Sequence, residues 1–243
     1  AQQLLLKLAR PETFPYAKWD IVGTSNIPAS GPAIIVGNHR SYFDVFAVSM
    51  AVARTGRAVR FLGKKEVFDA PVIGPLASAL GGIRVDRGTG SNEPLRAAEE
   101  ALAAGDMVAL MPQGTIPRGR AFFDPVLKGR WGAARLAQAS GAPVIPVGIW
   151  GTEKVWPRSA KVPNITNVTS PPRVSVTVGA PVDLARTDLE ADTVAIMAAI
   201  SALLPPEARE KREPTAEELR MSYPSGYKGD PGAEDERRPG FDT

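Results

Sequence analysis

The chain contains a single histidine, His39, and an aspartate, Asp44, follows it five residues later. Histidine is the side chain whose unperturbed pKa lies nearest neutrality, so it is the first candidate for moving a proton at neutral pH. A carboxylate on one ring nitrogen would fix the tautomer and stabilise the imidazolium, which leaves the other nitrogen to take a proton from a hydroxyl. The spacing lets Asp44 reach back to the ring if His39 lies in a turn and Asp44 in the first turn of a helix. The pair therefore predicts general-base chemistry.

A second interpretation of Asp44 stays open at this stage. Ser41 and Asp44 also match the S-x-x-[DE] pattern of a helix start, with Ser41 as the N-cap and the carboxylate favoured by the helix dipole. A histidine that follows a strand is, in addition, often only a hydrogen-bonded structural residue. The spacing alone does not separate these interpretations.

The elements expected around His39 are those of an α/β protein. The apolar run 33–36 predicts a buried strand before it, and residues 42–54 predict a helix after it, so His39 falls at a strand-to-helix turn, where α/β folds place ligands. The other predicted elements are strands at 19–22, 57–62, 83–85, 107–111, 144–149 and 174–178 and helices at 94–104, 129–140 and 187–204. This alternation predicts an α/β fold, a single domain with a largely parallel or mixed central sheet flanked by helices.

Helix ends carry their own signals. Gly105 is expected to take the left-handed conformation after the helix 94–104. Thr187 and Glu190 form a capping-box pattern at the start of the helix 187–204.

Three segments are expected along the chain. Residues 1–18 contain the stretch LLLKLAR and form a short N-terminal amphipathic segment that faces a membrane surface or packs on the domain. Residues 19–204 form the domain itself. Residues 205–243 are polar, charged and rich in proline and glycine, and they predict a C-terminal tail that wraps the domain or is mobile.

The composition excludes several classes of protein. A chain without cysteine has no disulfide framework, no thiolate metal site and no acyl-cysteine intermediate. With a single histidine, a transition-metal site would need carboxylate ligands almost alone, which suits zinc poorly, so we expect no metal. The net charge is +3 and the aromatic residues are not interleaved with basic ones, so nucleic acid is not an expected partner. No apolar run reaches the roughly 18–20 residues of a membrane-spanning helix. The sequons at Asn164 and Asn167 are interpreted as loop sequence.

Four blocks in order resemble the motifs of the glycerolipid acyltransferases, the PlsC-type lysophosphatidic acid acyltransferase family. Residues 38–44 (NHRSYFD) resemble the N-H-x-x-x-x-D motif, and residues 82–87 (GIRVDR) resemble G-x-I-x-x-D-R. Residues 111–115 (MPQGT) resemble the start of F-P-E-G-T-R, and residues 144–147 (VIPV) resemble the fourth, proline-interrupted strand. The basic segment 61–74 also matches, so that the resemblance spans roughly residues 19–185.

The resemblance implies transfer of a fatty acyl group from acyl-CoA or acyl-carrier protein to a hydroxyl of a lysophospholipid, 1-acylglycerol-3-phosphate first among them, in phospholipid biosynthesis. It implies no cofactor beyond the acyl donor, and peripheral attachment to the cytoplasmic side of the cell membrane. His39 would be the general base and Asp44 its orienting partner. The residues implied at the acceptor or its phosphate are Arg87, Gly114, Thr115, Arg118, Lys64 and Lys65, with Asn38, Gln113 and Lys128 in support.

The third block departs from the family in two places. Gln113 stands where the family has glutamate, which removes a charge but keeps an oxygen acceptor, and Ile116 stands where it has arginine. Arg118 or Arg120 is a candidate to replace that arginine. The alternatives are a different lysolipid acceptor, a hydrolase that uses His39 to activate water, and a non-catalytic lipid-binding protein that kept the fold. No nucleophile elbow, G-x-S-x-G, supports a serine hydrolase.

Overall fold

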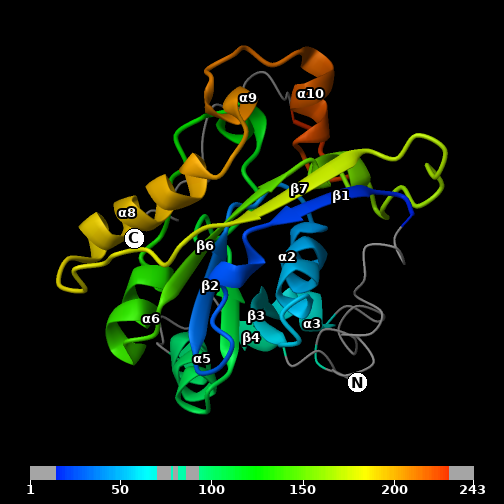
Figure 1. The fold of residues 1–243 in the computed structure, drawn as a ribbon. Helices are drawn as coiled ribbons and strands as arrows, with labels where there is room; N and C mark the ends of the chain where they lie inside the picture. Colours follow the sequence, from blue (N-terminus) through cyan, green and yellow to red (C-terminus); the bar gives the residue numbers. More distant parts are fainter. Residues whose placement is uncertain (1–14, 70–77, 79–81, 86–92, 230–243) are drawn as a thin grey trace.

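The computed structural model describes residues 15–69, 78, 82–85 and 93–229 of the 243-residue chain. Within these residues, seven strands form one sheet in the order β1-β7-β6-β2-β5-β3-β4 (Figure 1). The strands are β1 (Lys18–Val22), β2 (Ala33–Gly37), β3 (Val59–Lys64), β4 (Ile83–Val85), β5 (Met107–Leu110), β6 (Val144–Trp150) and β7 (Arg173–Val178).

The sheet is mixed because two strands, β1 and β7, run against the other five. Every neighbouring pair is parallel except β6 and β7, which are antiparallel. β2 lies at the centre, between β6 and β5, with Ile35 opposite Ile145 on one side and Ala109 on the other. The carboxyl ends of β2, β5 and β6 therefore meet at one edge of the sheet, and the segment that joins β6 to β7 starts from the same edge.

Helices cover both faces of the sheet (Figure 1). The α-helices are α2 (Asp44–Ala53), α3 (Lys65–Asp69), α5 (Glu93–Ala103), α6 (Gly132–Ser140), α7 (Thr152–Val155), α8 (Leu189–Ala202), α9 (Pro206–Arg209) and α10 (Ala216–Met221). Two short 3-10 helices are η2 (Thr24–Asn26) and η3 (Gly119–Phe122). α2 packs on one face in a core that includes Phe43 and Ala47, whereas α5, α6 and α8 close the other face over Ile34 and Val144.

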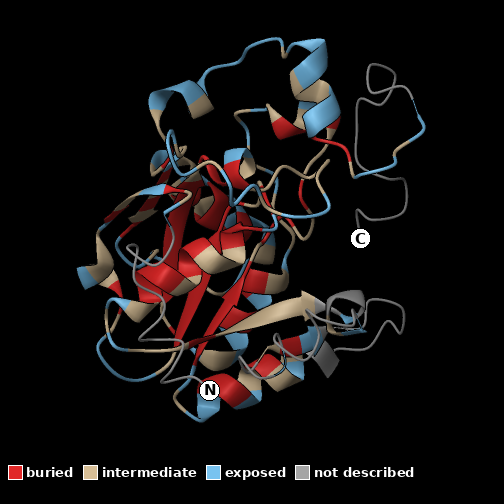
Figure 2. Ribbon diagram, turned by 90° about the vertical axis from the view of Figure 1, so that its right-hand side faces the viewer, coloured by how far each residue is buried: buried red, intermediate tan, exposed pale blue. Residues whose placement is uncertain are grey.

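The apolar patterns of the strands follow from these two layers. All five residues of β2 are buried, as expected for a central strand that helices cover on both sides. β7 instead alternates, with Val174, Val176 and Val178 buried and the residues between them more exposed. Figure 2 shows the buried strands in the middle of the molecule, beneath helices whose outer residues are intermediate or exposed.

The fold class expected from the sequence is confirmed. The elements that were predicted differ from the structure at their ends, and the short helices α3, α7, α9 and α10 were not predicted. The strand that follows β2, β3, runs from Val59 to Lys64 instead of 57–62, and α6 begins at Gly132 instead of residue 129. Gly105 has a φ of 85°, as the pattern at the end of α5 predicts. The capping-box prediction for α8 is wrong, because Asp188 is the N-cap and its carboxylate accepts from the backbone N–H groups of Glu190 and Ala191.

The segment after α8 folds onto the domain as far as the structure describes it. Thr215 and Glu218 form a capping box at the start of α10. Directly after that helix, the Ser222 hydroxyl accepts from the backbone N–H of Gly119, and Tyr223 is buried with its ring 4.3 Å from that of Tyr227. This segment therefore packs against η3, which lies between the MPQGT block and α6. Residues 1–14 and 230–243, part of the two predicted end segments, lie outside the described residues.

None of the helices in the described part of the chain combines the length and the hydropathy that a membrane-spanning helix needs.

Candidate active site

The site begins where β2 ends. Residues 38–43 form the turn between β2 and α2, so His39 follows the carboxyl end of the central strand. The sequence before it is apolar and buried, and the residues after it open a helix, which leaves the turn as the place where polar side chains gather. Loops that follow the carboxyl ends of parallel strands are the usual ligand sites of α/β sheets.

His39 and Asp44 are in direct contact. The ring nitrogen Nδ1 of His39 lies 2.8 Å from Oδ2 of Asp44, and the Asp44 side chain is fully buried while that of His39 is 19% exposed. Because the carboxylate occupies Nδ1, the nitrogen left to meet a substrate is Nε2. The arrangement can orient an imidazole and stabilise its protonated form after it takes a proton.

The same carboxylate holds the turn in shape. Oδ2 of Asp44 also accepts the backbone N–H groups of Arg40, at 2.6 Å, and Ser41, at 2.8 Å, and Oδ1 accepts the hydroxyl of Thr152. A buried carboxylate needs such donors to offset its desolvation. Asp44 therefore faces the imidazole and also ties the backbone that precedes its helix, whereas the helix-start interpretation with Ser41 as the N-cap is wrong, because Phe43 is the N-cap of α2.

Ser41 has a different task from the one that the N-cap pattern predicts. Phe43 is the residue before α2, and its N–H donates to the Ser41 hydroxyl at 2.9 Å. That hydroxyl donates in turn to the backbone carbonyl of Trp156 at 2.6 Å. Ser41 thus links the turn to the segment that follows α7.

Asn38 and Gln113 fix the turn to its two neighbouring strands. The Asn38 amide donates to the carbonyl of Ile149 at 2.8 Å and accepts the N–H of the same residue at 2.7 Å, which pins the turn to β6. On the other side, Oε1 of Gln113 accepts the backbone N–H of His39 at 2.7 Å. Gln113 is nearly buried, at 7% exposure, so this N–H would otherwise lack an acceptor away from water. The glutamine thus keeps the acceptor oxygen expected of the family's glutamate.

Gly114 lies in the tight turn that carries Gln113, and Arg130 packs against it. The N–H of Gly114 donates to the carbonyl of Met111 at 2.8 Å. The φ of Gly114 is 73°, a conformation that glycine adopts without strain. A Cβ added at Gly114 would lie 3.0 Å from Cδ and 3.1 Å from Nε of Arg130. The missing side chain therefore lets an arginine lie across the turn that holds the His39 backbone. Thr115 follows, partly exposed, with its hydroxyl 3.5 Å from the carbonyl of Ile116.

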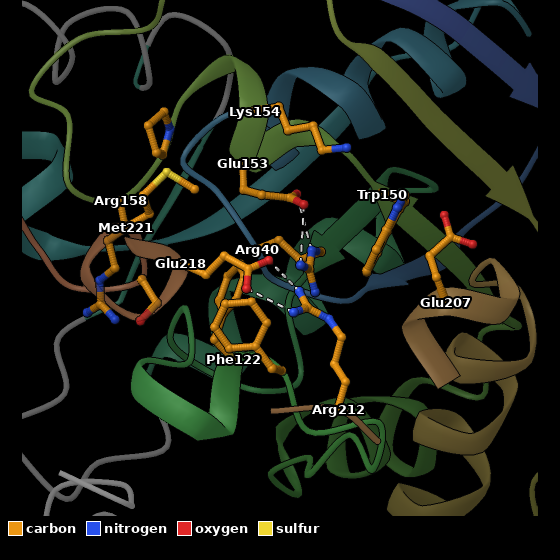
Figure 3. A pocket seen from close by; sticks show the side chains of 13 residues that line it. Arg40, Phe122, Trp150, Glu153, Lys154, Arg158, Glu207, Arg212, Glu218 and Met221 are labelled. Atoms are coloured by element: carbon orange, nitrogen blue, oxygen red, sulfur yellow. Dashed lines mark hydrogen bonds and ion pairs between the residues drawn. The ribbon is translucent and has the colours of Figure 1, made fainter. Parts of the chain in front are cut away.

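A cavity of about 270 Å³ opens beside Arg40 (Figure 3). The guanidinium of Arg40 lies between the rings of Phe122, 4.3 Å from the centroid, and Trp150, 4.0 Å away, and it pairs with Glu153 through Nε at 3.2 Å. The far side of the cavity is formed by the segment around α10. There, Figure 3 shows Arg212 directed at Glu218, whose carboxylate is 2.7 Å from the guanidinium. The turn that carries His39 therefore forms one wall of the cavity and the C-terminal segment forms another.

The predicted cations are spread over a wider area. Lys64 ends β3, two strands away from β2 at the same edge of the sheet, and Lys65 and Lys128 are exposed. Arg118 lies with its guanidinium 5.9 Å from the ring centroid of Tyr223, and Arg120 pairs with Glu213 at 3.5 Å. Both arginines therefore face the C-terminal segment. Arg87 lies outside the described residues.

Three contributors to the site were not predicted from the sequence. Thr152 reaches Asp44 across 108 residues, and Arg40 lines the cavity although its place beside His39 gave no sign of it. Arg130 lies across the MPQGT turn, and the sequence signal that could have identified this turn as a place of close approach is the glycine at position 114. Among the described residues, no group of three or more histidine, aspartate or glutamate side chains is placed to hold a metal ion.

Comparison with known proteins assigns the matched region to a family. The family described as Acyltransferase matches residues 18–150, more than half of the chain. The 1-acyl-sn-glycerol-3-phosphate acyltransferase of Brassica napus chloroplasts is 31% identical over 152 residues, which cover 61% of this chain and 42% of the relative. The enzyme of the same name from Bacillus subtilis is 27% identical over 131 residues, covering 54% of this chain and 62% of the relative. The matched region thus spans about two fifths of the plant protein and less than two thirds of the bacterial one.

The fold is shared with a solved acyltransferase structure. The 1-acyl-sn-glycerophosphate (LPA) acyltransferase PlsC from Thermotoga maritima superimposes with a TM-score of 0.60 at 24% sequence identity, covering 83% of this chain and 79% of that one.

Proposed function

The chain belongs to the acyltransferase family, and from that premise we propose that it transfers a fatty acyl group from an acyl thioester to a free hydroxyl of a lysophospholipid. The observation that carries the proposal is the 2.8 Å contact between Nδ1 of His39 and the fully buried carboxylate of Asp44 at the end of β2. Such a pair activates a hydroxyl and needs no covalent enzyme intermediate, because a thioester is already an activated acyl donor.

The proposed step runs as follows. The acceptor hydroxyl donates its proton to Nε2 of His39 as its oxygen attacks the thioester carbonyl. The buried Asp44 carboxylate stabilises the imidazolium that forms, because opposite charges attract strongly where water is excluded. The tetrahedral intermediate then expels the thiolate, which takes the proton from the imidazolium. The products are the acylated lipid and the free thiol, and His39 returns to its neutral form.

We propose acyl-CoA or acyl-carrier protein as the donor and 1-acylglycerol-3-phosphate as the first acceptor to test. The printed names of the plant and Bacillus relatives support this choice of acceptor. A lysophospholipid resides in a membrane, so we also propose that the protein works at the cytoplasmic face of the cell membrane, attached peripherally.

The acceptor's phosphate needs cations near the MPQGT turn. Arg87 stays the proposed main ligand, since an arginine fork matches phosphate geometry, with Lys64 and Lys65 in support. We propose Arg130 as the cation that replaces the arginine absent at Ile116, because its side chain lies across Gly114. The Arg118 guanidinium instead lies against Tyr223. Arg130→Met should raise KM for a phosphate-bearing acceptor by about tenfold, the effect of losing one charge-assisted contact, and Arg118→Met should raise it less. The reverse order would restore Arg118 as the ligand.

The test of the activity uses thiol detection. Because the chain has no cysteine, CoA released from a long-chain acyl-CoA can be followed without background from the protein. Release should require a lysophospholipid and should be abolished in His39→Ala while the variant keeps its cooperative thermal unfolding. Release without an acceptor would indicate a hydrolase instead. No release with any lysolipid of a panel, together with retained lipid binding, would indicate a lipid-binding protein.

A further inference from the structure

The loop that joins α7 to β7, residues 156–172, exposes aliphatic side chains at regular intervals. Val162 is 69% exposed, Ile165 55% and Val168 53%, so every third residue of its central part presents an apolar side chain to solvent. At the start of the loop, the ring of Trp156 packs edge-on against that of Tyr42, which is 44% exposed. Apolar side chains gathered on one exposed segment indicate a surface that a membrane or another protein molecule covers.

The loop is attached to the turn that carries His39. β6 runs antiparallel to β7 and parallel to β2, so the segment between β6 and β7 starts from the sheet edge where His39 follows β2. The carbonyl of Trp156 accepts the Ser41 hydroxyl at 2.6 Å, and the carbonyl of Pro172 accepts the N–H of Lys18 at 2.8 Å. In Figure 1 the loop extends beyond the neighbouring ends of β1 and β7. Whatever covers the loop therefore lies at the His39 edge of the sheet.

Hydrogen bonds hold polar groups of the loop to one another and to α7. Oδ1 of Asn164 accepts from the Thr166 hydroxyl at 3.0 Å, and Oδ1 of Asn167 accepts the N–H of Ser170 at 3.3 Å. The N–H of Asn164 also donates to the carbonyl of Val155 at 2.8 Å. These bonds give the loop a shape before it meets a partner, which lowers the entropy that docking would cost.

The charge of the loop favours an anionic lipid surface. Residues 156–172 contain no aspartate or glutamate, and Lys161 is exposed, whereas the other cation, Arg158, donates to the backbone carbonyl of Ile116 at 2.7 Å. Aliphatic side chains, a tryptophan with a neighbouring tyrosine, and lysine or arginine are the composition that lies in the headgroup region of a bilayer, where the apolar groups leave water and the cations meet phosphate.

We propose that residues 156–172 dock on the surface of an anionic bilayer, with Val162, Ile165 and Val168 inserted among the headgroups. The docked loop would hold the His39 turn at the depth where a lysophospholipid exposes its hydroxyl. The inference rests on the proposed function for the identity of that lipid, while docking itself can be measured without turnover.

The experiment is cosedimentation of the full chain with vesicles of phosphatidylcholine, alone or with phosphatidylglycerol added. The triple variant Val162→Ser, Ile165→Ser and Val168→Ser should bind the anionic vesicles at least about tenfold more weakly, because three apolar side chains no longer leave water. The control Val126→Ser with Val194→Ser changes side chains that are 66% and 59% exposed elsewhere, and it should bind as the unchanged protein does. Lys161→Glu should weaken binding to anionic vesicles only.

Activity separates this inference from the proposed function. The triple variant should lose turnover of a long-chain lysolipid presented in vesicles but keep turnover of a short-chain, water-soluble acceptor. Equal vesicle binding by the triple variant and the control would overturn the docking surface, even if both are active. A loss of self-association in the triple variant with unchanged vesicle binding would overturn it too, and would assign the loop to contacts between copies of the chain. Absence of turnover in every form would count against the proposed function alone.

Discussion

Two carboxylates in this molecule each collect several hydrogen bonds, Asp44 in the turn after β2 and Glu218 in α10. Asp44 accepts from the His39 ring, from two backbone N–H groups and from the Thr152 hydroxyl, and it is fully buried. Glu218 accepts two bonds from the Arg212 guanidinium and one from the backbone N–H of Thr215, but its side chain is 31% exposed.

The difference in burial decides what the two sets of bonds can do. Away from water, the charge on Asp44 has no solvent to replace a lost partner, so its bonds fix one geometry of the turn and of the His39 ring. At the surface, water competes for every bond of Glu218, so its three bonds cap a short helix and are worth little more than an exposed ion pair. The buried set shapes the candidate active site, and the exposed set holds the wall of the cavity beside Arg40.

Removal of the buried carboxylate of Asp44 should lower kcat more than changes at Gln113 or Gly114. Asp44→Asn keeps an oxygen for the backbone N–H groups, and the Thr152 hydroxyl can turn to accept from the new amide, so the variant should fold. It cannot stabilise the imidazolium, and kcat should fall by about 10³-fold or more, as when such a partner is neutralised in other base-assisted acyl transfers. CoA release measures kcat, and thermal unfolding measures the fold.

Asp44→Ala is the matched comparison. It leaves several buried donors without an acceptor, so the free energy of unfolding should drop by about 3 kcal/mol in addition to the loss of kcat. If Asp44→Asn kept more than a tenth of the original kcat, the carboxylate would be a structural cap and not the partner of a base.

Gln113 also holds the His39 turn through a hydrogen bond, but its acceptor is a neutral amide oxygen and not a carboxylate. Gln113→Leu has a similar volume but leaves the part-buried His39 N–H without its acceptor, which should cost about 1–3 kcal/mol of unfolding free energy. The loosened turn should also lower kcat by about tenfold, because the base is held less closely. Gln113→Glu restores the residue of the family motif, keeps the acceptor and should stay within about threefold of the original kcat. A tenfold loss in Gln113→Glu as well would mean that the two amide hydrogens of the glutamine matter and not its oxygen.

The local part of the site could be predicted from the sequence, and the remote part could not. His39 and Asp44 are five residues apart, so a strand followed by a helix is enough to bring them together. Thr152 reaches Asp44 only because β6 lies next to β2 in the sheet, and strand order is not visible in one sequence. The acceptor oxygen expected of Gln113 followed from its chemistry, whereas its partner, the N–H of His39, depends on the pairing of β2 with β5.

The helix ends show two other kinds of limit. Thr187 and Asp188 are adjacent residues that can both cap a helix, and the carboxylate of Asp188 takes the role in α8. Around α10, the T-x-x-E pattern of Thr215 and Glu218 was present in the sequence but lay in a segment interpreted as a polar tail. Its apolar anchor, Tyr223, is buried against a region more than a hundred residues earlier in the chain, and only the folded structure brings the two together.

A substitution at Gly114 should have a smaller effect, and it tests whether Arg130 contributes to acceptor binding. Gly114→Ala puts a side chain at a φ of 73° and places its Cβ 3.0 Å from Cδ of Arg130. Gly105→Ala is the matched control, since its φ of 85° imposes the same kind of backbone strain but no atom lies within 4 Å of the new Cβ. Each should lose about 1 kcal/mol to strain, and Gly114→Ala somewhat more because Arg130 must move. Only Gly114→Ala should raise KM for the acceptor. Equal KM values for the two variants would remove Arg130 from the acceptor site.

The smallest effect on stability is expected from changes at Glu218, and the contribution of its carboxylate to stability should depend on pH. The hydrogen bonds from Arg212 and from the Thr215 backbone lower the pKa of Glu218 to about 2. A carboxyl group whose pKa is lower in the folded state than in the unfolded chain, where it is about 4.3, stabilises the fold above the unfolded value. That contribution should therefore be lost as the pH falls from about 4.3 to about 2. The protection factors of the α10 amides, which correct for the intrinsic pH dependence of exchange, should fall over this range. Glu218→Gln should show faster exchange of these amides already at neutral pH, with a loss of stability of less than about 1 kcal/mol. The His39 turn should keep its slow exchange in Glu218→Gln, because no bond of Asp44 depends on that residue. If exchange at the turn quickened together with that of α10, the two carboxylates would belong to one cooperative unit, and the contrast between a buried and an exposed set of bonds would not hold.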